Sequence, residues 1–191
     1  MLLLHLIPGY NKEPWLRHHI LERGYKMPVQ QQTQQETPAK ILAKYHAIAP
    51  VDVLGVAKEL GLNVWGMHSL GQNISGKIFR DPTNGGPSGL SIVVNSTESP
   101  LRQRFTIAHE ISHFLLHRTQ LENGDLIDDT MYRSGLTTAE ESSANKLAAH
   151  ILMPFSLINA LVAEGISDVT SLADRLQVSR TAMKIRLGIP T

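Results

Sequence analysis

Residues 104–117 read RFTIAHEISHFLLH, and this stretch decides both the fold and the chemistry of the chain. His109 and His113 are four residues apart within a helical pattern, so their rings lie on one face of a helix, one turn apart. Imidazole nitrogens on adjacent turns can converge on one cation at about 2.0–2.1 Å. Glu110 follows the first histidine, where its carboxylate can reach a water on the metal without ligating the metal. The stretch therefore predicts a metal site with His109 and His113 as ligands.

The spacing His-Glu-x-x-His is the signature of metallopeptidases. Zinc lowers the pKa of a bound water from about 15.7 to near 7, so a neighbouring carboxylate can take its proton. Three fixed positions in five also arise by chance, but this motif follows a predicted strand and has apolar neighbours that suit a buried helix. Those neighbours are Ile107, Ala108, Ile111 and Phe114. We therefore interpret Glu110 as the catalytic base, because a non-enzymatic module with a silent metal site would not need it.

A third protein ligand is needed, and the sequence offers it on a second helix. The positions where metzincins carry glycine and a third histidine hold Leu116 and Thr119 here, which leaves a carboxylate. Glu140 and Glu141 open a predicted helix over 139–153 and are the natural candidates.

Both glutamates also fit a helix-capping role. Thr137 with Glu140, or Thr138 with Glu141, each spells a capping box. If Thr137 and Glu140 form the cap, Glu141 is left to bind the metal. We favour Glu141 as the third ligand and keep Glu140 as the alternative.

Four further residues near the motif are candidates for supporting roles. Asn145 lies four residues after Glu141, on the same helix face, and could fix a ligand histidine. Arg133 could orient Glu141 or stabilise a developing oxyanion, and Tyr132 could also donate to the oxyanion. His117 lies four residues after His113 on the same helix face, which places it a further turn, about 5.4 Å, along the helix axis. We therefore interpret it as a histidine at the end of the helix, where a positive charge is favourable, and not as a metal ligand.

Composition limits the class of protein. The chain has 191 residues, 42% of them hydrophobic, and a formal net charge of +1. It is long enough for one domain with a core, and its charge gives no global field that points to nucleic acid or a membrane. The absence of cysteine excludes disulfides and thiolate metal sites and fits a cytoplasmic location. Zinc is the expected ion, although manganese or iron could occupy the same ligands.

The first 37 residues look unlike the rest. Their opening run MLLLHLIP is shorter than the about 20 residues of a membrane span and lacks the flanks of a signal peptide. No other stretch is expected to span a membrane. Residues 29–36 read VQQQTQQE, a Gln-rich run of a kind that rarely packs. We therefore interpret 1–37 as a poorly ordered leader to a domain at 38–191, with Met27 as an alternative start.

The pattern from residue 38 onward predicts an α+β domain. Helices are expected at 38–48, 51–60, 100–118, 139–153, 168–176 and 179–187, and strands at 62–65, 76–80 and 91–95. A polar loop is expected between 118 and 139. If strand 91–95 lies at a sheet edge, it could pair with an extended substrate, but the sequence does not show that it does.

The C-terminal segment 166–191 has the pattern of a helix-turn-helix. This pattern supports an alternative function, a DNA-binding regulator that uses the metal site as a sensor. The segment holds four basic and two acidic side chains, a net charge of +2. This net charge is small for a DNA-binding segment, because contacts with phosphates dominate DNA affinity, so we do not expect direct nucleic-acid binding.

Two blocks of the sequence resemble the ImmA/IrrE family of metallo-endopeptidases. The first is 104–117, and the second is 141–154, which reads ESSANKLAAHILMP and is similar to the family's Glu-x-x-Ala-Asn segment ending in Leu-Met-Pro. The short segments 93–95 and 132–134 also match. The resemblance covers roughly 38–187, and the two blocks together are more specific than either alone.

The resemblance implies a zincin-like fold with a small mixed sheet beside the motif helix and a helical C-terminal segment. It implies zinc held by His109, His113 and Glu141. It also implies that the substrate is a helix-turn-helix repressor, often encoded nearby, in pairs that behave like toxin–antitoxin modules. The chain departs from the family pattern at Ser143, where an acidic residue is common, and in the leader 1–37.

Overall fold

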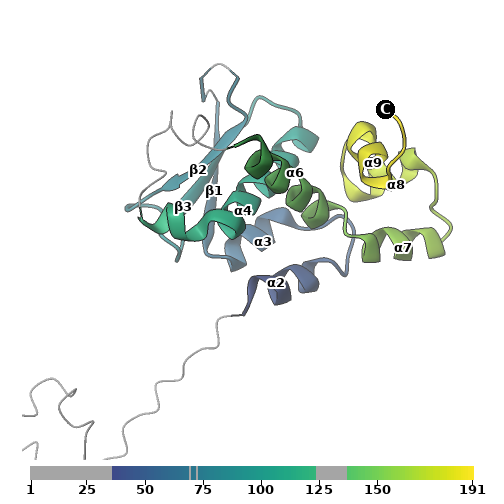
Figure 1. Ribbon diagram of the computed structural model, residues 1–191, viewed down its shortest axis with the longest axis horizontal. Coiled ribbons are helices and arrows are strands. Elements are labelled where there is room, and N and C mark those ends of the chain that lie inside the picture. The colour runs from purple at the N-terminus through teal and green to yellow at the C-terminus, as the bar shows by residue number, and fades with distance from the viewer. Residues whose placement is uncertain (1–35, 69, 72, 124–136) are drawn as a thin grey trace, which may run out of the picture. The chain divides into compact units, whose positions relative to one another are not determined.

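The motif helix lies between a small sheet and a second helix in the computed structural model, which describes residues 36–68, 70–71, 73–123 and 137–191 (Figure 1). Almost all of the predicted leader lies outside the described residues. The α-helices are α2 (Pro38–Tyr45), α3 (Val53–Glu59), α4 (Pro100–Asn123), α6 (Thr138–Leu152), α7 (Phe155–Ala163), α8 (Val169–Leu176) and α9 (Arg180–Leu187). The strands are β1 (Leu62–Met67), β2 (Gly76–Arg80) and β3 (Leu90–Asn95). This arrangement confirms the predicted α+β class.

The three strands form one mixed sheet in the order β1-β3-β2. β1 runs parallel to β3, with Leu62 opposite Leu90, and β2 runs antiparallel to β3, with Gly76 opposite Val94. The predicted mixed sheet is therefore confirmed. The suggestion that strand 91–95 could be an edge is wrong, because β3 uses both of its sides for main-chain pairing. Within the described sheet, β1 and β2 are the outer strands.

Gly76 allows β2 to approach the motif helix closely. A Cβ at this position would lie 2.5 Å from Cγ2 of Thr106 in α4 and 2.7 Å from the carbonyl oxygen of Val93. Real Cβ atoms are not found at such distances, so any other residue would push β2 away from α4. The glycine thus sets the width of the space between the sheet and the motif helix.

Helix α4 buries one face and carries the histidines on another. The predicted apolar neighbours of the motif are all buried, including Ala108 and Ile111 at 0% exposure. The helix was expected to end at 118 but continues to Asn123, with a non-helical backbone at His117 (φ −125°, ψ 23°). The predicted end therefore coincides with a kink, after which the first part of the expected polar loop is helical.

Helix α6 lies alongside α4, as the teal and dark green ribbons of Figure 1 show. Ala144 and Ala148 are fully buried, and such small side chains allow two helix backbones to approach closely. The helix begins with the capping box that the sequence predicted, formed by Thr137 and Glu140.

Helix α7 was not predicted. It follows Pro154, and Leu157, Ile158 and Leu161 are buried on its inner face. The expectation that no further stretch could span a membrane also needs correction, since Thr138–Ala163 is long and apolar enough by length and composition. In the fold this stretch is two helices separated at Pro154, and both contribute side chains to the core cluster.

Helices α8 and α9 confirm the two predicted C-terminal helices. Asp168 and Ser179 cap them by accepting hydrogen bonds from the backbone N–H groups of Ser171 and Ala182. Their inner residues, among them Leu172 and Met183, belong to the same hydrophobic cluster as the motif helix. Residues 36–191 form one compact unit. The helix-turn-helix-like segment is thus packed on the rest of this unit.

A core substitution in α8 tests whether this segment unfolds with the rest. Leu172 is 1% exposed, so Leu172→Ala should lower the free energy of unfolding by about 2–5 kcal/mol. We expect a single unfolding transition in urea, monitored by circular dichroism. Leu54→Ala is the matched control, since Leu54 is 55% exposed. Two separate transitions, with only the smaller one shifted by Leu172→Ala, would contradict a shared core.

His46 gives the domain a predictable pH dependence. Burial, and secondly the charge of His150, lower the pKa of the His46 ring below its usual 6.5. The unfolded chain then binds a proton at His46 more readily than the folded chain does. The free energy of unfolding is therefore at its full value above pH 6.5 and decreases as the pH falls below 6.5. His46→Gln should reduce the loss of unfolding free energy between pH 7 and pH 5. An unchanged pH slope, measured by urea titration at each pH, would show that His46 is not responsible.

Candidate metal centre

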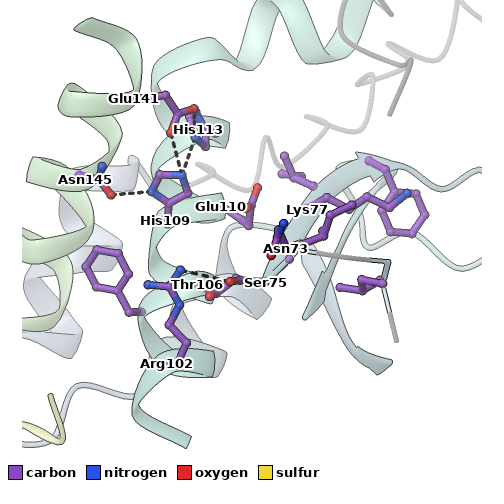
Figure 2. A pocket seen from close by; sticks show the side chains of 16 residues that line it. Asn73, Ser75, Lys77, Arg102, Thr106, His109, Glu110, His113, Glu141 and Asn145 are labelled. Atoms are coloured by element: carbon purple, nitrogen blue, oxygen red, sulfur yellow. Dashed lines mark hydrogen bonds and ion pairs between the residues drawn. The ribbon is translucent and has the colours of Figure 1, made fainter. Parts of the chain in front are cut away.

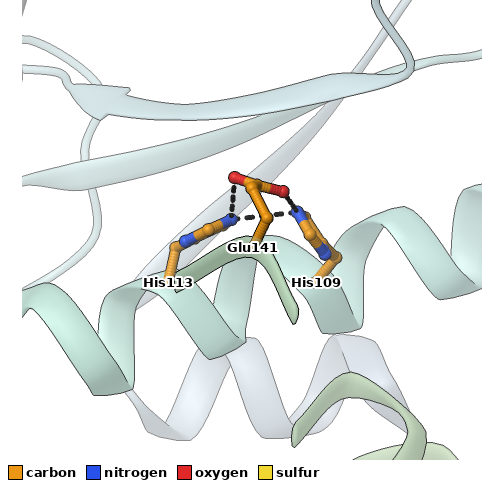
Figure 3. Close-up of side chains that lie close together, drawn as sticks. All are labelled: His109, His113 and Glu141. Atoms are coloured by element: carbon orange, nitrogen blue, oxygen red, sulfur yellow. Dashed lines mark hydrogen bonds and ion pairs between the residues drawn. The ribbon is translucent and has the colours of Figure 1, made fainter. Parts of the chain in front are cut away.

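Three side chains from α4 and α6 meet around one point (Figure 3). The Nε2 atoms of His109 and His113 are 2.9 Å apart. The two carboxylate oxygens of Glu141 each lie 3.4 Å from one of these nitrogens, Oε2 from His109 and Oε1 from His113. One ligand atom from each residue lies within 4.8 Å of the others. The two helices thus bring together three groups that could hold a metal ion.

The spacing of these atoms is near that expected around one cation. Bonds of about 2.0–2.1 Å at tetrahedral angles place neighbouring ligand atoms about 3.3 Å apart. Each Glu141 oxygen lies 3.4 Å from a different nitrogen, and the nitrogen–nitrogen distance of 2.9 Å is shorter than the tetrahedral value. The site is buried at His113, whose side chain is 1% exposed, and open at Glu141, which is 40% exposed. A site with three protein ligands and an open side is typical of catalytic zinc.

Asn145 holds the first histidine in place. Its Oδ1 lies 3.1 Å from Nδ1 of His109. With Nδ1–H as the donor, the lone pair of Nε2 points toward the other two ligands, which is the tautomer that a cation requires. Asn145 therefore lies where the sequence analysis expected a supporting residue.

The neighbouring glutamate has a different role. Oε2 of Glu140 accepts a hydrogen bond from the backbone N–H of Thr137 at 2.7 Å, and Oγ1 of Thr137 accepts one from the N–H of Glu140 at 3.2 Å. The hydrogen bonds that the carboxylate accepts from the backbone N–H and then from the hydroxyl of Thr137 hold the pKa of the Glu140 carboxyl below its usual value. Because Glu140 is held by the cap, only Glu141 of the two candidates faces the histidines.

Glu110 lies in the same pocket as the three groups. Its side chain is 3% exposed, and it lines a cavity of about 550 Å³ together with His109, His113 and Glu141. In Figure 2 its carboxylate points from α4 toward the space on the side of β2. It therefore lies beside the three groups that could hold a metal ion and is not one of them, and its role as the base stays a prediction.

Among the described residues, the remaining candidate, His117, is not in the group of three. The His117 ring stacks on His113 with centroids 5.8 Å apart, at the kink of α4, and is half-buried. Tyr132 and Arg133 lie outside the described residues, so their predicted roles stay predictions.

The far wall of the pocket comes from residues that sequence reasoning missed. Asn73, Ser75 and Lys77 face the motif helix in Figure 2. Arg102 of α4 donates from Nη2 to the Ser75 hydroxyl at 3.1 Å and so joins the two walls. The alternation of buried Ile78 with Lys77 and Phe79 in β2 was a signal that these two side chains share a face. Nothing in the sequence indicated that this face meets the motif.

Comparison with known proteins finds one matching family and similar relatives. Residues 57–188 match the family described as the IrrE N-terminal-like domain. The radiation response metalloprotease IrrE of Deinococcus deserti is 41% identical over 102 residues, which cover 50% of this chain and 35% of that protein. Its namesake in Deinococcus radiodurans is 43% identical over 75 residues, which cover 38% of this chain and 22% of that protein. The chain thus covers well under half the length of either relative.

A solved structure shares the fold. A transcriptional regulator of Mycobacterium tuberculosis superposes with a TM-score of 0.52 at 14% identity, over 92% of this chain and 51% of that one. At this identity the likeness concerns the arrangement of the elements alone.

Neighbouring glutamates give a matched test of the metal site. Glu141→Gln should lower zinc affinity by at least about 100-fold, the upper end of the loss seen when a supporting partner of a ligand is removed. Glu140→Gln should leave it unchanged, because glutamine also completes a capping box. Competition with a chromophoric chelator measures both affinities. Equal losses in the two variants, or none in Glu141→Gln, would exclude this ligand set.

Proposed function

Because the chain belongs to the IrrE N-terminal-like domain family, we propose that it is a zinc-dependent endopeptidase whose ion is held by His109, His113 and Glu141. The observation that carries the proposal is the meeting of these three ligand atoms within 4.8 Å, in a pocket that also holds Glu110. Both Deinococcus relatives are metalloproteases by name, which supports proteolysis. Two imidazoles and a carboxylate suit zinc best, with manganese or iron as alternatives.

The proposed mechanism divides the work between the ion and the chain. A bound cation would supply an electrophile for the scissile carbonyl and a water of lowered pKa. Glu110 takes the proton of the attacking water and passes it to the leaving amine. Its position next to His109 on one helix fixes its distance from the ligands without relying on a flexible loop. Its low exposure keeps bulk water away from the proton transfer.

Strand β2 borders the space in which a substrate would lie. Residues 76–79 line the pocket, and Gly76 brings the strand close to α4. We propose that an extended peptide binds in this narrow space, alongside β2 and across the three ligand groups. Strand 91–95 was the candidate for this role from the sequence.

The substrate that we propose is a helix-turn-helix repressor encoded nearby. The family resemblance of the two sequence blocks implies such a partner. Its cleavage would regulate transcription, in an arrangement similar to a toxin–antitoxin pair. A cytoplasmic location is consistent with a chain that has no cysteine.

The alternative of a DNA-binding regulator is not favoured. Met183 of α9 is fully buried, so part of this helix packs inward. The Arg186 guanidinium donates to the carbonyl of Met153 at 2.9 Å and lies 4.1 Å from the centroid of the Phe155 ring. The Arg186 guanidinium therefore contacts the protein itself, whereas in a recognition helix such a group would contact a DNA phosphate.

Removing the base should separate zinc binding from hydrolysis. We expect Glu110→Gln to keep zinc and to lower kcat by about 10²–10⁴-fold, the usual contribution of a general base. The loss is measured by mass spectrometry of two cleavage reactions, one on a proteome-derived peptide library and one on the neighbouring repressor. Glu140→Gln is the control with the same chemical change outside the site. If Glu110→Gln cleaves as fast as the wild type, the proposed mechanism is wrong.

A further inference from the structure

A second hollow opens beside the metal pocket and is larger than it. Its volume is about 920 Å³, and it lies between the first turns of α4, the outer face of α6, and α9. We call it the α6–α9 groove. Its apolar lining includes Leu101, Phe105, Ala149, Val178, Ala182 and Ile185.

The groove presents large apolar side chains to solvent. Ile185 is 66% exposed and Leu101 is 40% exposed. On α9, Met183 is fully buried, so Ile185 is not needed for the packing of its own helix. Concave surfaces with contiguous exposed apolar groups are typical of binding sites. The groove therefore has the character of a docking surface for an apolar face.

The charges around the groove are basic. Arg102, Lys146 and Arg186 line it, and Glu141 is its one acidic lining residue among the described residues. Arg102 lies 3.8 Å from a Glu98 oxygen, and Arg186 donates to the carbonyl of Met153. Lys146 is therefore the cation on which the match to an acidic occupant chiefly depends. The Glu141 oxygens face the histidine nitrogens at 3.4 Å. An occupant with acidic side chains beside its apolar face would complement this surface.

The groove is continuous with the metal pocket. Arg102, Phe105, Glu141 and Asn145 line both cavities, and in Figure 2 Arg102, Glu141 and Asn145 border the space around His109. A polypeptide held across the metal ligands therefore has a direct path into the groove.

We propose that the α6–α9 groove binds an acidic amphipathic helix of the protein substrate, on one side of the bond to be cleaved. A groove between helices suits a helix that inserts apolar side chains at helical spacing. The proposal rests on the proposed peptidase function and adds a recognition element to it. The scissile segment is extended in the metal pocket, and the flanking helix supplies affinity and selectivity.

Peptide length and charge test the proposal. A short peptide that the zinc-loaded protein cleaves is compared with the same peptide extended, at either end, by an acidic amphipathic segment of leucine, alanine and glutamate. About 14 residues make four helical turns. One of the two extensions should raise kcat/KM by about 10-fold through KM, the effect of one good anchor. No gain from either acidic extension would overturn the proposal.

Two exposed groove residues give the matching variants. Ile185→Asp should abolish the gain from the extension. Lys146→Glu should reduce it for an acidic extension and restore it for a lysine-containing one. Leu54→Asp, on α3 and 55% exposed, places the same charge outside both cavities and should keep the full gain. A gain that survives in Ile185→Asp would show that the extension binds elsewhere.

Other occupants and a failure of the peptidase function give different results. If light scattering shows a dimer of the wild type and a monomer of the Ile185→Asp variant, the groove binds a second copy of the chain. Binding of generic duplex DNA that Lys146→Glu abolishes would assign it to nucleic acid, and either result overturns the proposal. If the wild type cleaves no peptide, the proposed function fails. Anisotropy of the fluorescein-labelled acidic segment on the zinc-loaded protein still tests the groove: binding lost in Ile185→Asp supports it, and no binding overturns it.

Discussion

The close packing of α4 on α6 is the constraint on which the site depends. Glu141, Asn145 and Ala148 recur at helical spacing on one face of α6, so the packing that buries Ala148 also brings the carboxylate and the amide to His109. A large residue in place of Ala148 would separate the helices and move Glu141 away from the rings. The candidate metal centre thus depends on a hydrophobic contact, and its three groups come from parts of the chain that only the fold brings together.

Two local devices fix the details of this arrangement. The capping box of Thr137 and Glu140 sets where α6 begins and therefore which glutamate faces the histidines. On the opposite wall, Gly76 lets β2 approach α4 closely enough to form a narrow pocket. One device positions a ligand, and the other positions the strand that we propose as the substrate's partner. Neither contributes a group to the chemistry itself.

The sequence predicted what depends on local spacing and missed what depends on contacts between distant segments. The pair His109 and His113 and the capping boxes at Thr137 and Thr138 are short-range patterns that the sequence displays, and the structure forms the box at Thr137. The central position of β3 and the approach of Lys77 to the motif depend on strand order, which no short pattern encodes. Helix α7 was missed because its nine residues, FSLINALVA, are apolar on most faces and give no clear period. The kink at His117 was missed because no proline or glycine, the residues typical of kinks, lies there.

The central claim is that two imidazoles from one helix and one carboxylate from another bind a single cation. X-ray absorption at the zinc edge of the zinc-loaded full chain tests this most directly. We expect a first shell with the scattering signature of two imidazoles at about 2.0–2.1 Å and oxygen at about 2.0–2.2 Å, and a change in this shell when Glu141 is replaced. A shell made of oxygen alone, without imidazole scattering, would contradict it.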